Sequence, residues 1–203
     1  MTSTGKSVLF WLTLIVVSVG IWTLSSTFER ISADGAAAAQ PGPGAAGAVD
    51  PEARLKELGI ALPAPGAPIA SYVNAVQTGN LLFLSGKGPL PQDGKDVVGR
   101  LGKDMTVEQG YQAARSVAIA HLAVLKKERG DLKRVTRIVK VLGMVNSDPA
   151  FTQQPAVVNG YSDLMVAVFG DKGKHARSAV GMATLPGGIP VEVEVVVEIG
   201  PVR

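Results

Sequence analysis

The 203-residue chain contains no cysteine and only two histidines, His121 and His175. Without cysteine it has no disulfide, thiol nucleophile or cysteine-ligated zinc, and two histidines do not supply a histidine-rich metal site. Neither sign of charge predominates in the chain: 20 basic and 17 acidic residues leave a formal net charge of +3. No basic stripe interleaved with aromatic residues is present, as nucleic-acid binding would require. We therefore expect no metal, no cofactor and no nucleic-acid partner.

Charged residues are absent from one long stretch near the N-terminus. Residues 7–28 carry no charge and are strongly apolar. At ~1.5 Å per residue they extend about 33 Å as a helix, enough to cross a bilayer core. We expect residues 1–31 to form a transmembrane anchor, with Lys6 on the cytoplasmic side and the folded domain outside, in the periplasm. The alternative is a signal peptide that is cleaved within residues 36–39, which would release the domain as a secreted protein.

Large side chains are scarce in the segment that follows. Residues 32–66 are rich in Ala, Gly and Pro, a composition typical of a flexible linker. Within it we predict a short helix over residues 51–58, with Asp50 as the N-cap and Gly59 as the end. We assign residues 67–203 to the domain proper.

Hydrophobic periodicity in this domain predicts the element order ββ-α-β-α-ββ. The expected strands are 72–76, 81–85, 135–145, 177–184 and 191–199, and the expected helices are 107–129 and 155–169. Valine and glutamate alternate along the last strand, so one face of the sheet is expected to be buried. The order indicates an α+β domain with two helices on one face of the sheet. The other face would be either solvated or buried between subunits.

Arg177 and Glu192 are the main candidates for chemistry. A guanidinium can donate two parallel hydrogen bonds to a carboxylate or phosphate. Arg177 begins one predicted strand, and Glu192 lies on the strand expected to adjoin it, where it could hold a water near the bound ligand. The alternatives are an ion pair between Arg177 and a glutamate across the sheet, and a solvated Glu192.

Four stretches resemble the RidA/YjgF/YER057c/UK114 family of small proteins. They are its opening strand (69–76), its Ser-Gly-x-x-Pro turn (84–89), its Ala-Arg-Ser signature (176–178), and its closing turn and strand (185–186 and 191–194). They occur in the family's order over residues 67–202, about two-thirds of the chain. The domain is therefore similar to a sister branch of the imine deaminases, with an added N-terminal segment.

The resemblance implies a chorismate-mutase-like mixed sheet, a homotrimer, and a ligand pocket at each subunit interface. It also implies hydrolysis of reactive 2-imino or enamine acids to 2-keto acids and ammonia. Arg177 would bind the substrate carboxylate and Glu192 would position the attacking water. Tyr72 would line the pocket, and the backbone N–H groups of Gly86 and Ala179 would contact the ligand.

Two departures from the deaminase pattern favour a second interpretation. Gly181 stands where the deaminases often carry an acidic residue, and the segment 169–175 is longer than theirs. Export would also separate the domain from the usual cytoplasmic source of imino acids. The alternative is a membrane-tethered trimer that binds a small carboxylate without catalysis. His175, in a Gly/Lys-rich loop, is expected to be exposed, and His121 is expected at the edge of the core.

Overall fold

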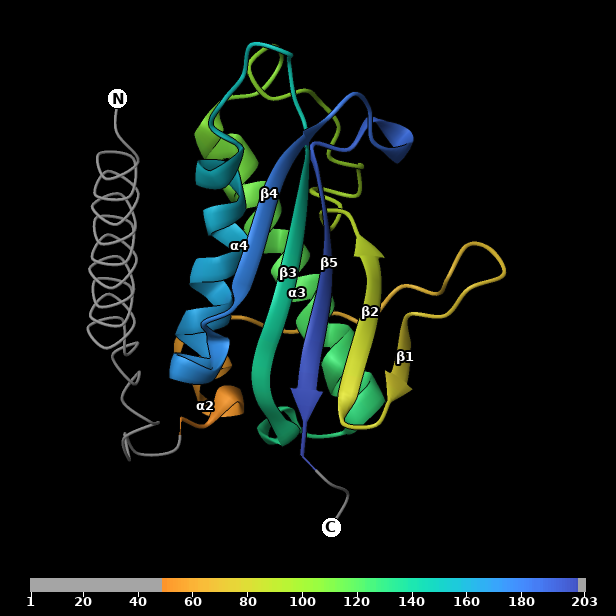
Figure 1. Ribbon diagram of the computed structural model, residues 1–203, viewed down its shortest axis with the longest axis vertical. Helices are drawn as coiled ribbons and strands as arrows, with labels where there is room; N and C mark the ends of the chain where they lie inside the picture. The colour runs from red at the N-terminus through yellow and green to blue at the C-terminus, as the bar shows by residue number, and fades with distance from the viewer. Residues whose placement is uncertain (1–48, 201–203) are drawn as a thin grey trace, which may run out of the picture. The chain divides into compact units, whose positions relative to one another are not determined.

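A five-stranded mixed sheet carries two long helices on one face (Figure 1). The computed structural model describes residues 49–200. The strands are β1 (Ala75–Thr78), β2 (Leu81–Lys87), β3 (Val135–Asn146), β4 (Ala176–Met182) and β5 (Val191–Ile199). The helices are α2 (Pro51–Glu57), α3 (Val107–Arg129) and α4 (Gln154–Phe169), with 3-10 turns η1 (Leu132–Arg134), η2 (Gly170–Gly173) and η3 (Pro186–Gly188). The predicted α+β class and the two covering helices are confirmed.

The strand order is β1-β2-β5-β3-β4, and only the β3–β4 pair is parallel. The expectation that the strand of Glu192 adjoins the strand of Arg177 is therefore wrong, because β3 lies between β5 and β4. The physical reason is the connection through α4, since a helical crossover returns the chain parallel to the strand it left. Strand β4 is thus placed at the edge of the sheet, next to β3.

The first hairpin differs from the prediction at its outer strand. Strand β1 begins at Ala75, three residues later than expected, and a two-residue turn at Gly79 and Asn80 leads into β2. The N–H of Tyr72 donates to the carbonyl of Ala70 (2.8 Å), so the chain makes a local turn there instead of pairing. An apolar run predicted a strand at this place, but the side chains of Tyr72 and Val73 are exposed and gain nothing from the sheet, whereas Asn74 is buried.

Helix α3 begins and ends as its sequence predicts. Thr106 and Gln109 form the expected capping box, and Gly130 ends the helix with a φ of 73°. Helices α3 and α4 pack closely because Gly160 has no side chain: a Cβ there would overlap the backbone carbonyl of Tyr111. The two helices therefore form one closely packed layer against the sheet.

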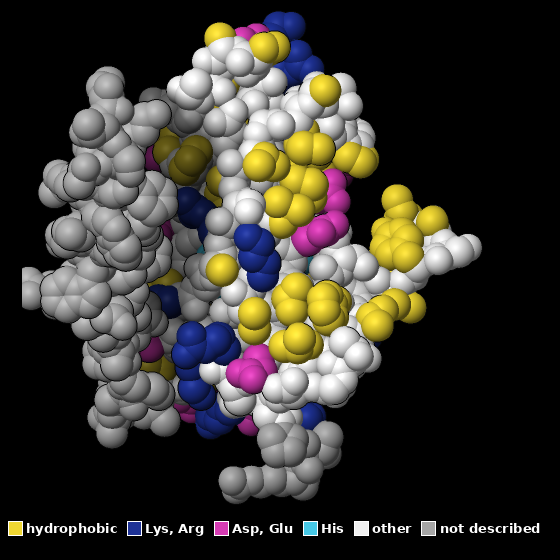
Figure 2. Space-filling model, viewed as in Figure 1, with side chains coloured by type: hydrophobic (Ala, Val, Ile, Leu, Met, Phe, Trp, Pro, Cys, Tyr) yellow, Lys and Arg dark blue, Asp and Glu magenta, His cyan; other side chains and the backbone are white. Residues whose placement is uncertain are grey.

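The two faces of the sheet differ as the alternation in β5 predicted. Odd-numbered residues Val191 to Ile199 are buried under the helices, whereas Glu192, Glu194 and Glu198 lie on the open face. Figure 2 shows hydrophobic side chains gathered on this open face among a few charged ones. Its exposed large hydrophobic residues include Val76, Phe83 and Val180.

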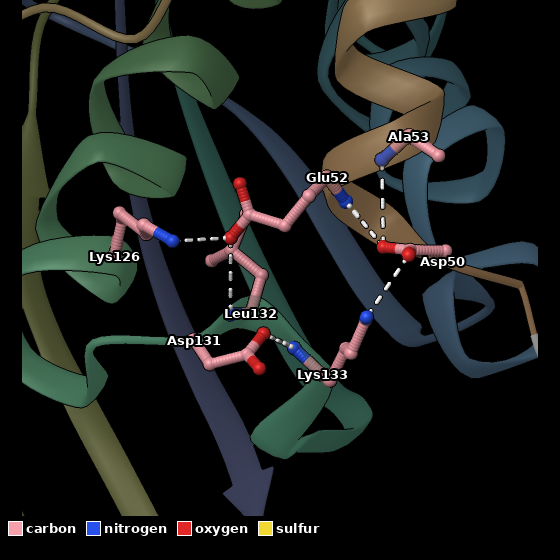
Figure 3. Close-up of polar contacts among 7 residues, drawn as sticks. All are labelled: Asp50, Glu52, Ala53, Lys126, Asp131, Leu132 and Lys133. Atoms are coloured by element: carbon pink, nitrogen blue, oxygen red, sulfur yellow. Dashed lines mark hydrogen bonds and ion pairs between the residues drawn. The ribbon is translucent and has the colours of Figure 1, made fainter.

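Helix α2 is held against the ends of α3 and η1 (Figure 3). Asp50 accepts hydrogen bonds from the first backbone N–H groups of the helix and pairs with Lys133 at 2.9 Å. Glu52 pairs with Lys126 at 2.6 Å, and Leu55 is buried in the core. The last part of the segment predicted as a linker therefore packs on the domain. The predicted cap at Asp50 is confirmed.

Within residues 49–200, no helix combines the length and apolar character needed to cross a membrane. The segment 7–28, in which the anchor is predicted, lies outside the described residues.

Candidate functional site

Arg177 lies near the start of edge strand β4, on the face that α4 covers. Its Nη1 donates to Oδ1 of Asn159 (2.9 Å) and to Oγ of Ser162 (3.0 Å), and its Nη2 donates to the carbonyl of Pro155 (3.4 Å). All three acceptors belong to α4. The side chain remains partly exposed. Arg177 is therefore a half-exposed cation held by one helix.

His175 is partly buried, so the prediction of an exposed loop histidine is wrong. The η2 turn folds the segment back so that Nε2 lies 3.0 Å from Oγ of Ser162 and Nδ1 lies 2.6 Å from the carbonyl of Gly173. Burial lowers the pKa of His175, the Gly173 bond opposes this, and the charge of Arg177 lowers the pKa further. A carbonyl can only accept, so the neutral ring carries its proton on Nδ1. Its Nε2 then accepts from the Ser162 hydroxyl.

Glu192 lies half-buried on the open face of β5, opposite Met144 of β3. Burial raises the pKa of Glu192, and the charge of Glu194 raises it further. Gly86 lies directly against it, since a Cβ at Gly86 would overlap Oε1 of Glu192. A carboxyl group with a raised pKa can take up and release a proton closer to neutral pH than an ordinary glutamate.

The sequence did not predict a buried hydrogen-bond network that is formed by His121, Tyr161 and the backbone carbonyl of Ser85, the residue before Gly86. Nδ1 of His121 lies 3.0 Å from the Tyr161 hydroxyl, and Nε2 lies 3.1 Å from the carbonyl of Ser85. Both rings are fully buried, and desolvation lowers the pKa of His121 to about 4. The neutral ring therefore donates to Ser85 and accepts from Tyr161. This holds the part of β2 where its register with β5 shifts, between Leu84 and Lys87.

The predicted ligand-binding residues lie in three separate places on the domain. Ala179 lies two residues after Arg177 on β4 and packs partly against the core. Tyr72 lies in the loop before β1, with 45% of its surface exposed, beyond the opposite edge of the sheet. Gly86 and Glu192 lie between these edges, on β2 and β5. A single chain does not bring the five residues together.

The register of the strands shows which face of the sheet carries Arg177 and which carries Glu192. Arg177 lies beside Val141 of β3, and Val141 lies opposite Val195 of β5, both buried under the helices. Glu192 is three residues from Val195, and neighbouring positions of a strand alternate between faces. Arg177 and Glu192 therefore point to opposite faces of the sheet.

Two cavities of the domain lie away from the predicted ligand-binding residues. A cavity of about 500 Å³ at the end of β5 is lined by residues that include Gln77, Arg134 and Glu198. Another of about 690 Å³ lies between the 92–98 loop and the start of α3. None of the five predicted ligand-binding residues lines either cavity. Within residues 49–200, no three His, Cys, Asp or Glu side chains are grouped to hold a metal ion.

Comparison with known proteins decides the family. A family described as "YjgF/chorismate mutase-like, putative endoribonuclease" matches residues 52–196. The chain belongs to the YjgF family. Protein TCP17 of Trypanosoma cruzi is 47% identical over 148 residues, covering 72% of this chain and 92% of that protein. Protein HMF1 of Saccharomyces cerevisiae is 31% identical over 130 residues, covering 64% of this chain and 85% of that protein.

Two solved structures share the fold of this YjgF-family domain. Protein Atu1372 of Agrobacterium tumefaciens, described as having unknown function, has 43% identity and a TM-score of 0.68, covering 74% of this chain and 92% of its own. A "putative endoribonuclease" of Shewanella oneidensis has 31% identity and a TM-score of 0.71, covering 74% and 99%. The resemblance predicted from the sequence is confirmed at the level of family and fold.

Proposed function

We propose that this YjgF-family chain works as a homotrimer with ligand clefts between neighbouring subunits. The observation that carries the proposal is the separation of Arg177 from Tyr72, Gly86 and Glu192 in one chain. In a closed head-to-tail ring, the β4 edge of one copy meets the β1–β2 side of the next. Such a ring joins the two half-sites once per interface. The apolar open face of the sheet, visible in Figure 2, supports its burial between copies.

Arg177 is suited to bind a small carboxylate in this cleft. Its contacts with described residues use Nη1 twice and Nη2 once, and none of them uses Nε. The edge formed by Nε and Nη2 can therefore donate two parallel hydrogen bonds to one planar carboxylate. The backbone N–H of Ala179, on the same strand, is the proposed second contact.

We propose that the cleft hydrolyses 2-imino acids, with Glu192 of the neighbouring copy as the general base. The carboxylate of Glu192 accepts a proton from water while the water oxygen bonds to the imine carbon, the C=N π bond breaks, and the nitrogen takes up a proton from solvent. Glu192 then returns its proton to the amine nitrogen of the carbinolamine. The hydroxyl loses its proton to solvent as the C–N bond breaks, which releases ammonia and leaves a 2-keto acid. Fixing the acid group and one water beside an electrophilic carbon provides most of the catalysis required.

A second candidate function is carboxylate binding without turnover. Gly181 favours it, because a Cβ at this position would lie 2.9 Å from both Nε2 of Gln154 and Oγ of Ser147. The acidic side chain that deaminases often carry there has no room unless the side chains of Gln154 and Ser147 both move. In this second candidate Arg177 binds the ligand and Glu192 only lines the cleft.

The two candidates are separated by one assay. The full chain is given 2-iminobutanoate, generated in situ by an amino-acid oxidase, and 2-oxobutanoate formation is compared with the rate in buffer. Acceleration that is lost in Arg177→Ala and Glu192→Gln supports the hydrolase. No acceleration, with binding of 2-oxobutanoate that needs Arg177, supports the binding protein. Wild-type behaviour of Arg177→Ala in both measurements rejects the proposed site.

We also propose that residues 7–28 anchor the chain in a membrane with the domain in the periplasm. The uncharged apolar run supports this, and Lys6 before it supports the orientation. Protease added to intact spheroplasts should digest the domain. Full protection of the domain would contradict the proposal.

A further inference from the structure

The guanidinium of Arg177 is the last member of a chain of hydrogen bonds that leads back to a backbone carbonyl. Gly173 accepts from Nδ1–H of His175, and Nε2 of His175 accepts from the Ser162 hydroxyl. Ser162 Oγ in turn accepts from Nη1 of Arg177. Each bond thus has one assigned donor and one assigned acceptor, so the chain runs in a single direction. The neutral state of His175 that this direction requires agrees with the lowered pKa of the ring.

This chain of bonds fixes the rotation of the guanidinium. Asn159 is exposed, and its bond to Nη1 competes with water. The bond from Nη1 to Ser162 is partly buried and therefore loses less to solvent. Holding Nη1 against α4 fixes the direction of the edge formed by Nε and Nη2, whose one contact with a described residue is the long Nη2 bond to the Pro155 carbonyl (3.4 Å). That edge is the one that fits a carboxylate in two-point contact.

We propose that Ser162 and His175 are positioning residues for the ligand cation, through the bonds from Gly173 to Arg177. They do not touch the ligand; they hold the guanidinium in the rotation that presents the edge formed by Nε and Nη2. This inference rests on the proposed carboxylate site. It makes a further prediction about the unliganded protein that does not depend on any ligand.

Three variants separate positioning from simple structural support. Ser162→Ala removes the middle member of the chain. His175→Asn keeps a donor for Gly173 but is too short to reach Ser162. His175→Gln places an amide oxygen near the position of Nε2, where it can accept from Ser162. Losing one hydrogen bond of about 0.5–1.5 kcal/mol corresponds to a weakening of about 2- to 10-fold.

The experiment measures the affinity of the full chain for 2-oxobutanoate by calorimetry at pH 8, with thermal melting as the folding control. We expect binding to weaken about 2- to 10-fold in Ser162→Ala and His175→Asn, and to stay near wild type in His175→Gln. In parallel, NMR of the unliganded protein reports the Arg177 Nη protons. Separate signals in the wild type and in His175→Gln that merge in Ser162→Ala show that the rotation is held by this chain.

Each result bears on a different claim. Wild-type affinity in both Ser162→Ala and His175→Asn, with binding abolished by Arg177→Ala, overturns the positioning role and leaves the carboxylate site standing. Wild-type affinity in Arg177→Ala rejects the site itself. If the site is rejected in this way, the positioning role is tested by the NMR signals of the unliganded protein alone. Arg177 Nη signals that remain separate in Ser162→Ala overturn the positioning role. Equal weakening in His175→Gln and His175→Asn also overturns it.

Discussion

Arg177 and Glu192 lie on opposite faces of one sheet, with strand β3 between their strands. They are the cation and the carboxylate of the proposed chemistry, so no small molecule can touch both within one chain. Any site that uses the pair must be built from two copies. The quaternary structure is therefore part of the functional proposal and can be tested through it.

Gly86 is predicted to be required for the position of Glu192. A Cβ in Gly86→Ala would overlap Oε1 of Glu192 and push the carboxylate out of place. We expect a loss of kcat of the order of 10- to 100-fold, as for other small displacements of catalytic groups. Overpacking should also lower the free energy of unfolding by about 1–3 kcal/mol. Gly66→Ala is the control, because nothing lies within 4 Å of its Cβ. Equal kcat in the two variants would contradict the prediction.

His121 is predicted to make the protein less stable in acid. Its folded pKa of about 4 is lower than its ordinary value of 6.5. The unfolded chain therefore takes up a proton below pH 6.5 that the folded state refuses until about pH 4. Stability from this residue is complete above pH 6.5 and falls by about 1.4 kcal/mol per pH unit as the pH drops toward 4. Urea unfolding at several pH values should show a weaker acid dependence in His121→Gln. The same slope in both proteins would exclude this role.

The pKa of His175 is predicted to respond to Arg177. The positive charge of Arg177 lowers the pKa of His175, although burial is the larger cause. In Arg177→Ala, NMR titration of the ring should give a higher pKa than in the wild type, because the repelling positive charge is removed. An unchanged or lower value would mean that the two groups do not interact in solution. The pKa of His121 in the same spectra serves as the internal control.

Helix α2 is predicted to stabilise the domain through Leu55 more than through its ion pairs. Leu55 is buried with only 4% of its surface exposed, so Leu55→Ala should cost about 2–5 kcal/mol. The Lys126–Glu52 pair is partly exposed, so Lys126→Ala should cost less than about 1 kcal/mol. Denaturant unfolding of both variants measures the difference. A larger cost for Lys126→Ala would reverse our view of how the helix is held.

The elements of the domain were predictable because their signals are local. The capping box at Thr106 and the alternation from Val191 to Ile199 each lie within a few residues of sequence, and both predict their element correctly. The start of β1 was missed because an apolar run does not reveal the turn at Tyr72. Local sequence patterns therefore predicted the type of each element more accurately than the residues at which it begins and ends.

The arrangement of the candidate site was less predictable because it depends on distant parts of the chain. Residues 177 and 192 are close in sequence. Their strands are nevertheless separated, because β3 (residues 135–146) pairs with both of them and lies between them. His121 and Tyr161 are 40 positions apart, and only their place on buried helix stripes marked them. The contact of His175 with Ser162 requires the η2 turn, which a Gly/Lys-rich loop does not reveal.

The most direct test of a shared site is complementation between two inactive variants. Arg177→Ala and Glu192→Gln are each expected to lose 2-iminobutanoate hydrolysis, and then to regain it when co-expressed and purified as mixed oligomers. Random assembly of equal amounts in a head-to-tail ring gives an intact Arg177–Glu192 pair at about one interface in four, so about a quarter of wild-type activity should return. Mixed oligomers that form and remain inactive, beside an active wild type, would contradict a site shared between subunits.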